Sequence, residues 1–231
     1  MADRSVLVTG GTGGLGAAVT AVFVEAGWRV VAPQRHTPTP AADPGDNAPV
    51  RLVADLTDAA DAARVAEVAA GDPAAPLRAV VNLVGGYASA GLVHETPVEE
   101  FDRMLALNLR PTHLVTRATL PHLVSAGGGA VVCVAARAAL SPFPGVAGYV
   151  TAKAAVLAFA AAVAVEYKAS GVRCNTVLPS VIDTPTNRAA MPDADHSRWV
   201  APTEIASVIR FLASDESAPT SGAAVPVYGR A

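Results

Sequence analysis

The sequence predicts a single α/β domain, built on a seven-stranded parallel sheet with helices on both faces. Three observations predict it. Short apolar runs alternate with amphipathic or Ala-rich stretches along the chain, which is typical of parallel sheets. A glycine-rich turn follows the first apolar run at once. The chain has 231 residues, 52% of them hydrophobic, which is enough for one sizeable core. We therefore expect one domain over residues 1–231.

The composition argues against several classes of partner. Charged residues make up 16% of the chain, the net charge is −3 and no basic stripe is present, so we expect no nucleic-acid partner. Gly, Pro or charged residues interrupt each apolar run before it reaches the length of a transmembrane helix, so we expect no membrane partner. The first residues lead directly into an apolar run, which leaves no room for a signal peptide and predicts a cytoplasmic protein.

Both cysteines of the chain, Cys133 and Cys174, lie inside apolar, strand-like runs. This placement predicts buried free thiols in a reducing compartment rather than a disulfide. No group of His, Cys and Asp residues has the spacing of metal ligands, so we expect no metal site.

A glycine-rich turn at residues 10–16 follows the first predicted strand, residues 5–9, and opens a helix over about residues 15–26. Glycines let a pyrophosphate approach the backbone, and a helix N-terminus offers free N–H groups and a positive dipole end. A flexible glycine loop is the alternative, but the position directly after a strand favours a dinucleotide site. The predicted cofactor-binding residues of this turn are Gly10, Thr12, Gly14, Leu15 and Gly16.

The end of the second predicted strand, residues 28–33, bears on the choice of cofactor. An acidic side chain there would bind a ribose 2′-hydroxyl, whereas a basic one accommodates a 2′-phosphate. Gln34, Arg35 and His36 follow the strand, so no acid is present and Arg35 favours NADP(H). NAD(H) stays possible if Arg35 is only a solvated loop residue. The prolines of residues 37–49 then predict an irregular connection near the adenine end of the cofactor.

Polar residues and glycines close the third and fourth predicted strands, residues 50–54 and 77–83. Ligands of an open parallel sheet bind at the carboxyl ends of its strands. The glycines after the fourth strand therefore suggest a close approach of the backbone to a ligand. The residues at these two ends are Asp55 and Leu56, then Asn82, Gly85, Gly86 and Tyr87.

Asn108 lies in the middle of the apolar stripe of a helix predicted over about residues 97–124. A buried amide needs hydrogen-bond partners. One interpretation is a core amide that ties down a helix irregularity, and the other is a polar relay beneath a functional site. The two interpretations are compatible.

Tyr149 and Lys153 open an Ala-rich helix that is predicted to reach about Ser170, after a fifth strand over residues 130–135. Residues four apart lie on one face of a helix, so a phenol and an ammonium are held side by side. The ammonium favours the phenolate, which lowers the pKa of the phenol and makes it a better acid or base near neutral pH. The alternative is a surface pair whose spacing arose by chance.

The remaining elements complete the sheet and one side of a substrate pocket. We expect a sixth strand over residues 172–178, a helix over about residues 202–214 and a last strand over residues 223–227. The polar segment over residues 184–200 is short for a lid, which suggests an open pocket and a small or planar substrate. Tyr87, Phe143 and Ser180 are candidate wall residues, although each is equally consistent with ordinary packing.

These motifs together resemble the short-chain dehydrogenase/reductase family, over essentially the full chain. Residues 9–16 fit its T-G-x-x-x-G-x-G turn, and residues 82–85 are similar to its N-N-A-G, with Leu83 and Val84 as departures. Residues 201–222 resemble its P-E-E-I-A…F-L-A-S-D…T-G ending. Three members of the family's catalytic tetrad are matched by Asn108, Tyr149 and Lys153.

The resemblance implies a Rossmann fold and hydride transfer between a nicotinamide and a carbonyl or alcohol carbon of a small-molecule substrate. Tyr149 would exchange a proton with the substrate oxygen, Lys153 would lower the pKa of Tyr149 and bind the nicotinamide ribose, and Asn108 would hold a relay water. A homodimer or homotetramer is implied, paired through the helices of Asn108 and Tyr149. The resemblance extends the cofactor site to Asp55, Leu56, Asn82, Gly85, Pro179 and Thr184.

The chain departs from the family at the serine of the tetrad, which normally lies thirteen residues before the tyrosine. Ala136 occupies that position and follows Ala135, so both hydroxyls of the usual serine pair are absent, and Ser141 does not fit the register. Pro179-Ser180 also replaces the usual Pro-Gly. Loss of one hydrogen-bond donor to the reacting oxygen typically costs about 10²–10³ in rate.

Three functions stay open after this departure. The chain can be a reductase of a substrate that needs only Tyr149, as in dihydropteridine reductases, which resemble it in lacking the serine and in the Gly-Gly after the fourth strand. It can be a carbonyl or 3-oxoacyl reductase in which Arg137 or a water replaces the serine. It can also be a cofactor-binding sensor or partner subunit with little turnover.

Overall fold

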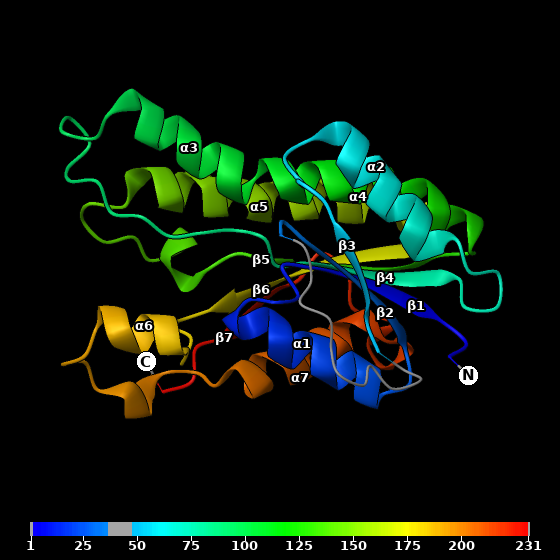
Figure 1. The fold of residues 1–231 in the computed structure, drawn as a ribbon. Coiled ribbons are helices and arrows are strands. Elements are labelled where there is room, and N and C mark those ends of the chain that lie inside the picture. The colour runs from blue at the N-terminus through cyan, green and yellow to red at the C-terminus, as the bar shows by residue number, and fades with distance from the viewer. Residues whose placement is uncertain (1, 37–47, 231) are drawn as a thin grey trace.

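Seven parallel strands form one sheet in the order β3-β2-β1-β4-β5-β6-β7 (Figure 1). The computed structural model describes residues 2–36 and 48–230, so most of the connection predicted at residues 37–49 lies outside the described residues. The strand order reverses at β1, which places a topological switch point between β1 and β4, where sheets of this kind bind ligands. The strands are β1 (Ser5–Thr9), β2 (Arg29–Gln34), β3 (Val50–Val53), β4 (Leu77–Asn82), β5 (Gly129–Val134), β6 (Val172–Pro179) and β7 (Ala224–Val227).

Helices cover both faces of the sheet, as predicted. α2, α4 and α5 lie on one face, with α3 packed against α5, while α1 and α7 lie on the other (Figure 1). The predicted Rossmann-type arrangement is therefore confirmed. The helices are α1 (Gly14–Glu25), α2 (Ala59–Ala70), α3 (Val98–Asn108), α4 (Arg110–Ser125), α5 (Ala147–Glu166), α6 (Pro185–Ala190) and α7 (Pro202–Ala213).

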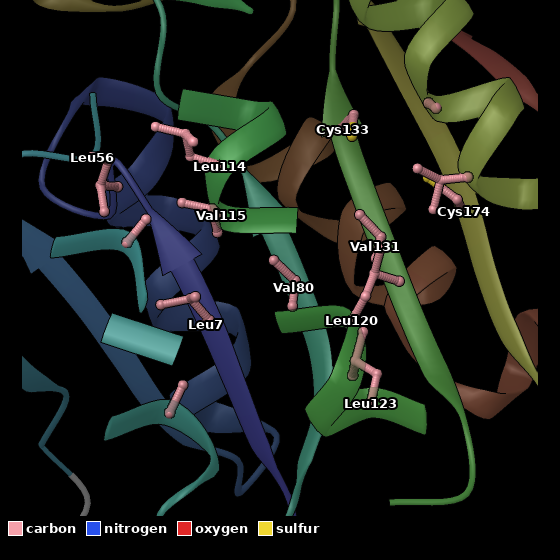
Figure 2. Packing of buried hydrophobic residues seen from close by; sticks show 14 of the residues in the cluster. Leu7, Leu56, Val80, Leu114, Val115, Leu120, Leu123, Val131, Cys133 and Cys174 are labelled. Atoms are coloured by element: carbon pink, nitrogen blue, oxygen red, sulfur yellow. The ribbon is translucent and has the colours of Figure 1, made fainter. Parts of the chain in front are cut away.

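The two faces of the sheet bury separate apolar cores, because side chains alternate along a strand. Leu7 points to the core under α2, α4 and α5, where Leu114 and Leu123 pack with it (Figure 2). Val6 and Val8 point to the opposite core under α1 and α7. Both cysteines lie in the first of these cores and are free thiols, as the sequence predicted.

The helix predicted over residues 97–124 is divided into α3 and α4 at Leu109. Pro111 explains the break, because proline has no N–H to donate and its ring collides with the carbonyl one turn earlier. Asn108 stabilises it, since Nδ2 donates to Met104 O at 3.1 Å and Thr112 Oγ1 donates to Asn108 O at 3.2 Å. The interpretation of Asn108 as the amide at a helix irregularity is confirmed.

The long α5 corrects one expectation. The sequence predicted no apolar run of transmembrane length, yet α5 is 20 residues long and contains an 18-residue window with a mean hydropathy of 1.8, which satisfies that length and composition. Within the fold, α5 packs against β6 and α3, and it buries Val156, Ala160 and Val163 in the core. It is the only such helix in the described residues.

Candidate active site

The glycine-rich turn between β1 and α1, residues 10–16, forms a concave surface made mostly of backbone atoms, which we call the cradle. A Cβ atom on Gly16 would lie 2.0 Å from Gly10 O, so only glycine lets α1 begin this close to the turn. Gly10 has a φ of +67°, which favours glycine, and it lies against the backbone that follows β4. No side chain caps the N-terminus of α1. Its free N–H groups therefore fit the pyrophosphate for which this turn was predicted.

Thr184 lies over the same cradle, although 170 residues separate it from Gly14. A Cβ atom on Gly14 would lie 2.8 Å from Thr184 Cγ2. The Thr184 hydroxyl accepts a hydrogen bond from Asn187 N at 3.2 Å and caps α6, a short helix within the polar segment that was expected over residues 184–200. The signal for it was present, since Thr184 at the N-cap and Pro185 at the first helical position are typical of a helix start.

The ends of β2 and β3 carry the residues predicted to bind the adenine side of the cofactor. Asp55 Oδ1 accepts hydrogen bonds from Thr57 Oγ1 at 2.7 Å and Thr57 N at 2.9 Å, which lower the pKa of Asp55, and the charge of Arg35 lowers it further. Arg35 and Asp55 therefore face the same region. The side chain of Leu56 is buried in the core (Figure 2), so only its backbone is available to a ligand.

Thr9 and Asn82 close β1 and β4 at the switch point. Thr9 Oγ1 accepts a hydrogen bond from Leu83 N at 3.0 Å, which ties the segment after β4 to the end of β1. Asn82 Nδ2 donates to Thr116 Oγ1 at 3.0 Å, whereas Asn82 Oδ1 is buried and has no hydrogen-bond partner among residues 2–36 and 48–230. Nothing in the sequence predicts the contact with Thr116, apart from the presence of a hydroxyl in an apolar helix.

Asn108 holds the glycines that follow β4. Its Oδ1 accepts a hydrogen bond from Gly86 N at 3.1 Å, and its Nδ2 donates to Gly86 O at 3.0 Å. A Cβ atom on Gly85 would lie 2.6 Å from Asn108 Oδ1 and 3.1 Å from Lys153 Nζ. Gly85, Asn108 and Lys153 therefore meet at one point, as the sequence predicted, and a side chain at position 85 would close it.

Lys153 is 6% exposed and lies beneath this point. Its Nζ donates one hydrogen bond, at 3.0 Å, to the carbonyl oxygen of Val134 at the end of β5. Burial lowers the pKa of Lys153 to about 8, against a small opposing effect of the Cys133 thiol. Lys153 keeps two donors of its ammonium beyond the one that Val134 receives.

Tyr149 corrects the electrostatic expectation. The sequence predicted that Lys153 lowers its pKa, but burial raises the pKa of Tyr149 to about 12, and the neighbouring Tyr87 adds to the rise. The rings of Tyr87 and Tyr149 meet edge to face, with centroids 5.2 Å apart. The Tyr149 phenol is therefore neutral at pH 7, and its hydroxyl makes no hydrogen bond within residues 2–36 and 48–230.

The three predicted wall residues and Ala136 differ in their surroundings. Ala136 is 8% exposed and extends the end of β5, so no hydroxyl is presented there. Phe143 and Tyr87 are largely exposed. Ser180 follows Pro179 at the end of β6, and its hydroxyl donates a hydrogen bond to Tyr228 O at 2.7 Å.

A larger hollow, of about 370 Å³, lies at the opposite, amino edge of the sheet. Arg4, Arg78, Lys168 and Arg173 line it, but the guanidinium of Arg173 donates to Leu212 O, Ser214 O, Thr220 O and Ser217 Oγ. Arg78 donates to Ala126 O at 2.6 Å. Arg78 and Arg173 thus satisfy backbone carbonyls and stabilise this edge, so we place the candidate site at the carboxyl edge.

A comparison with known families shows which family the chain belongs to. The family model for short chain dehydrogenases matches residues 4–195. The chain belongs to the short-chain dehydrogenase/reductase family. Family membership makes it an oxidoreductase that uses NAD(P), and it confirms the resemblance seen in the sequence.

Relatives of this short-chain dehydrogenase/reductase cover almost its whole length. It is 33% identical to the 2-(R)-hydroxypropyl-CoM dehydrogenase of Xanthobacter autotrophicus over 98% of both chains. It is also 33% identical to the D-threitol dehydrogenase of Mycolicibacterium smegmatis over 98% of this chain and 92% of that one. A short-chain type dehydrogenase/reductase from Mycobacterium ulcerans has the same fold, with a TM-score of 0.92 and 27% identity, over 100% of this chain and 90% of that one.

Proposed function

We propose that this short-chain dehydrogenase/reductase interconverts a carbonyl and an alcohol, with Tyr149 as the group that exchanges the proton with the substrate oxygen. One observation carries the proposal. The start of α5 brings the Lys153 ammonium beside Gly85 and Asn108 at the carboxyl edge of the sheet, and Tyr149 lies one turn earlier on the same helix, in contact with Tyr87. The glycine cradle of α1 lies at the same edge. The relatives, which are named as dehydrogenases of several alcohols, support the reaction class.

The cofactor fits residues from five strand ends. The turn at Gly10, Gly14 and Gly16 would hold the pyrophosphate, and Asp55 with the backbone of Leu56 would hold the adenine side. Backbone groups near Asn82, Gly85 and Pro179 would line the nicotinamide side, with Thr12, Leu15 and Thr184 over the cradle. Arg35 supports a preference for NADP(H), although Asp55 shares its surroundings. When bound, the nicotinamide supplies or removes the hydride.

Tyr149 completes the proton balance of the reaction. In reduction, the carbonyl carbon gains the hydride, the C=O bond becomes a C–O single bond, and the Tyr149 phenol gives its proton to the oxygen. The product is an alcohol, and a phenolate remains on Tyr149. A pKa of about 12 keeps the phenol protonated at neutral pH, so Tyr149 holds the proton that reduction requires.

Lys153 and Asn108 then restore the proton. Lys153 stays predominantly an ammonium at pH 7, since its pKa is about 8, and it attracts the phenolate left on Tyr149. Its remaining donors suit the hydroxyls of a ribose. Asn108 Oδ1 accepts one bond from Gly86 N and keeps a second lone pair for a water that returns protons from solvent.

We also propose that the chain forms a homodimer or homotetramer. α5 exposes Ala158, Ala161, Ala162 and Val165 on the face turned away from the core, and small side chains permit the close approach of a second helix. Size-exclusion chromatography with light scattering would test this arrangement, and a monomeric mass at micromolar concentration would reject it.

The experiment that tests the function combines cofactor binding with turnover. NADPH and NADH are titrated against the purified protein by fluorescence, and oxidation of the tighter cofactor is followed with a panel of ketones, aldehydes, 3-oxoacyl esters and quinonoid dihydropterin. We expect tighter binding of NADPH and turnover of a ketone or aldehyde that falls above about pH 8, where Lys153 loses the ammonium that attracts the phenolate. Cofactor binding without turnover of any member of the panel would reject the proposal.

A further inference from the structure

The edge-to-face contact between Tyr87 and Tyr149 brings a second phenol to the candidate site. Ala136 offers no hydroxyl at the end of β5, so the polarisation of a substrate oxygen would otherwise depend on Tyr149 alone. The centroids of the two rings are 5.2 Å apart at an interplanar angle of 77°. Burial raises the pKa of Tyr149, and the neighbouring phenol of Tyr87 raises it further.

The segment that carries Tyr87 is held at both ends. On one side, Gly86 exchanges two hydrogen bonds with the side chain of Asn108. On the other side, Ser89 Oγ and Ala90 N donate to Gly145 O, each at 3.0 Å. Gly145 lies two residues before the start of α5. The two anchors therefore hold the segment of Tyr87 against Asn108 at the end of α3 and against the residues that lead into α5.

Tyr87 is nevertheless 60% exposed, and its hydroxyl makes no hydrogen bond within the described part of the chain. A phenol that is fixed through its backbone, unpaired at its hydroxyl and in contact with the proton donor has the properties of a ligand-binding group rather than of a core side chain. Ordinary packing would bury the ring, which is the reverse of what is seen.

We infer that Tyr87 is a catalytic residue that donates the second hydrogen bond to the substrate oxygen, the bond that the serine at position 136 gives in the family. The inference rests on the proposed function and deepens it. The Tyr87 hydroxyl donates and keeps its proton throughout, while Tyr149 transfers its own, so the balance of the reaction is unchanged. Because the exposed ring of Tyr87 also offers an apolar face, it selects carbonyl compounds with a planar or apolar group beside the C=O.

A double-mutant cycle between positions 87 and 136 tests the inference. With the best substrate of the panel, Tyr87→Phe keeps the ring and should lower kcat by about 100-fold, the typical cost of losing one donor. The KM of NADPH should not change. Ala136→Ser should change the wild type little, but it should restore most of the lost kcat in the Tyr87→Phe background.

Two results would overturn the inference. A Tyr87→Phe enzyme with the kcat of the wild type would show that the hydroxyl is not used. A slow Tyr87→Phe enzyme that Ala136→Ser does not restore would show that the Tyr87 hydroxyl does not act on the substrate oxygen. The matched control is Tyr167→Phe, since Tyr167 lies at the opposite end of α5 and should leave kcat unchanged.

A measurement without substrate separates this inference from the proposed function. The chain has four tyrosines, so a spectrum with labelled tyrosine rings is simple to assign with single Tyr→Phe variants. We expect a nuclear Overhauser effect between the ring protons of Tyr87 and Tyr149. Its absence would overturn the inference even in an active enzyme, whereas failure of the whole substrate panel would reject the proposed function and leave this contact to be judged by the spectrum.

Discussion

The two edges of the sheet use polar side chains in opposite ways. At the amino edge, Arg173 donates to three carbonyls and one hydroxyl, and Ser5 donates to Ala75 O at 2.6 Å. At the carboxyl edge, Lys153 donates to a single carbonyl, Asn82 Oδ1 is buried without a partner, and the Tyr149 hydroxyl makes no hydrogen bond in the described ranges 2–36 and 48–230. The polar side chains of the amino edge are therefore used in hydrogen bonds that stabilise the fold, whereas those of the carboxyl edge keep donors and acceptors available to a ligand.

This difference has an energetic cost at the carboxyl edge. A buried polar atom without a partner costs about 1–3 kcal/mol, and a buried ammonium costs more. Hydrogen bonds from the guanidinium of Arg173, by contrast, stabilise the loops after α7 and before β7. The hydrogen bonds at the amino edge and the apolar cores therefore offset the free energy that the unpaired polar groups at the carboxyl edge cost. Substitutions at the two edges should separate stability from activity.

The largest effect on cofactor binding is expected from Gly16→Ala in the cradle. The new Cβ atom would lie 2.0 Å from Gly10 O and 2.8 Å from Gly11 Cα, so the turn must open. Affinity for NADPH should fall on the order of 100-fold, as expected when a binding group moves by about 1 Å. The control is Gly13→Ala in the same turn, where the nearest atom is 3.4 Å away and φ is −72°. Equal affinities of the two variants would contradict the role of the cradle.

The next effect is expected at the amino edge. Arg173→Met leaves the carbonyls of Leu212 and Ser214 without their donor and should lower the free energy of unfolding by about 4 kcal/mol, with no change in kcat of the folded enzyme. Urea unfolding and steady-state kinetics measure the two quantities. Arg4→Met is the control, because its ion pairs are with exposed Asp3 and Asp215 and should contribute under about 1 kcal/mol. A large loss of kcat in Arg173→Met would contradict the claim that the amino edge contributes to stability and not to activity.

In contrast to Arg173, Lys153 should lower the free energy of unfolding at pH values below 8, where it is charged and buried. Its pKa is lowered by burial from 10.5 to about 8, so its contribution to stability is present above pH 10.5 and is lost as the pH falls through 8. Relative to Lys153→Met, the free energy of unfolding of the wild type should rise on the order of 3 kcal/mol between pH 8 and pH 10.5. Urea unfolding at several pH values measures it. A constant difference across this range would show that the ammonium is not buried.

The smallest effect concerns cofactor choice. Arg35→Ala should weaken the binding of NADPH by about tenfold, which is near the contribution of one charge-assisted hydrogen bond at an exposed site. The binding of NADH should not change. Fluorescence titration with both cofactors measures the change. Arg64→Ala serves as the control, because Arg64 is exposed on α2 and already pairs with Asp61. Equal weakening of both cofactors would remove the argument for NADP(H).

The sheet, its seven strands and most helices follow from the sequence, because strand and helix periods and glycine turns are local signals. The break at Leu109 was also readable in principle, since Pro111 is a local signal. The meeting of Gly85, Asn108 and Lys153 followed from the family motifs. The pKa of Tyr149 could not be predicted from the spacing to Lys153, because burial and Tyr87 depend on the tertiary structure. The contacts of Ser180 with Tyr228 and of Asn82 with Thr116 are likewise long-range.

The most direct test of the central claim is the rate of NADPH oxidation by Tyr149→Phe with the best substrate of the panel. If the carboxyl edge holds Tyr149 available to transfer a proton, loss of its hydroxyl should lower kcat by about 10³, within the range for general acid catalysis, while NADPH binds as in the wild type. A Tyr149→Phe enzyme that binds NADPH and turns over at the wild-type rate would contradict the account.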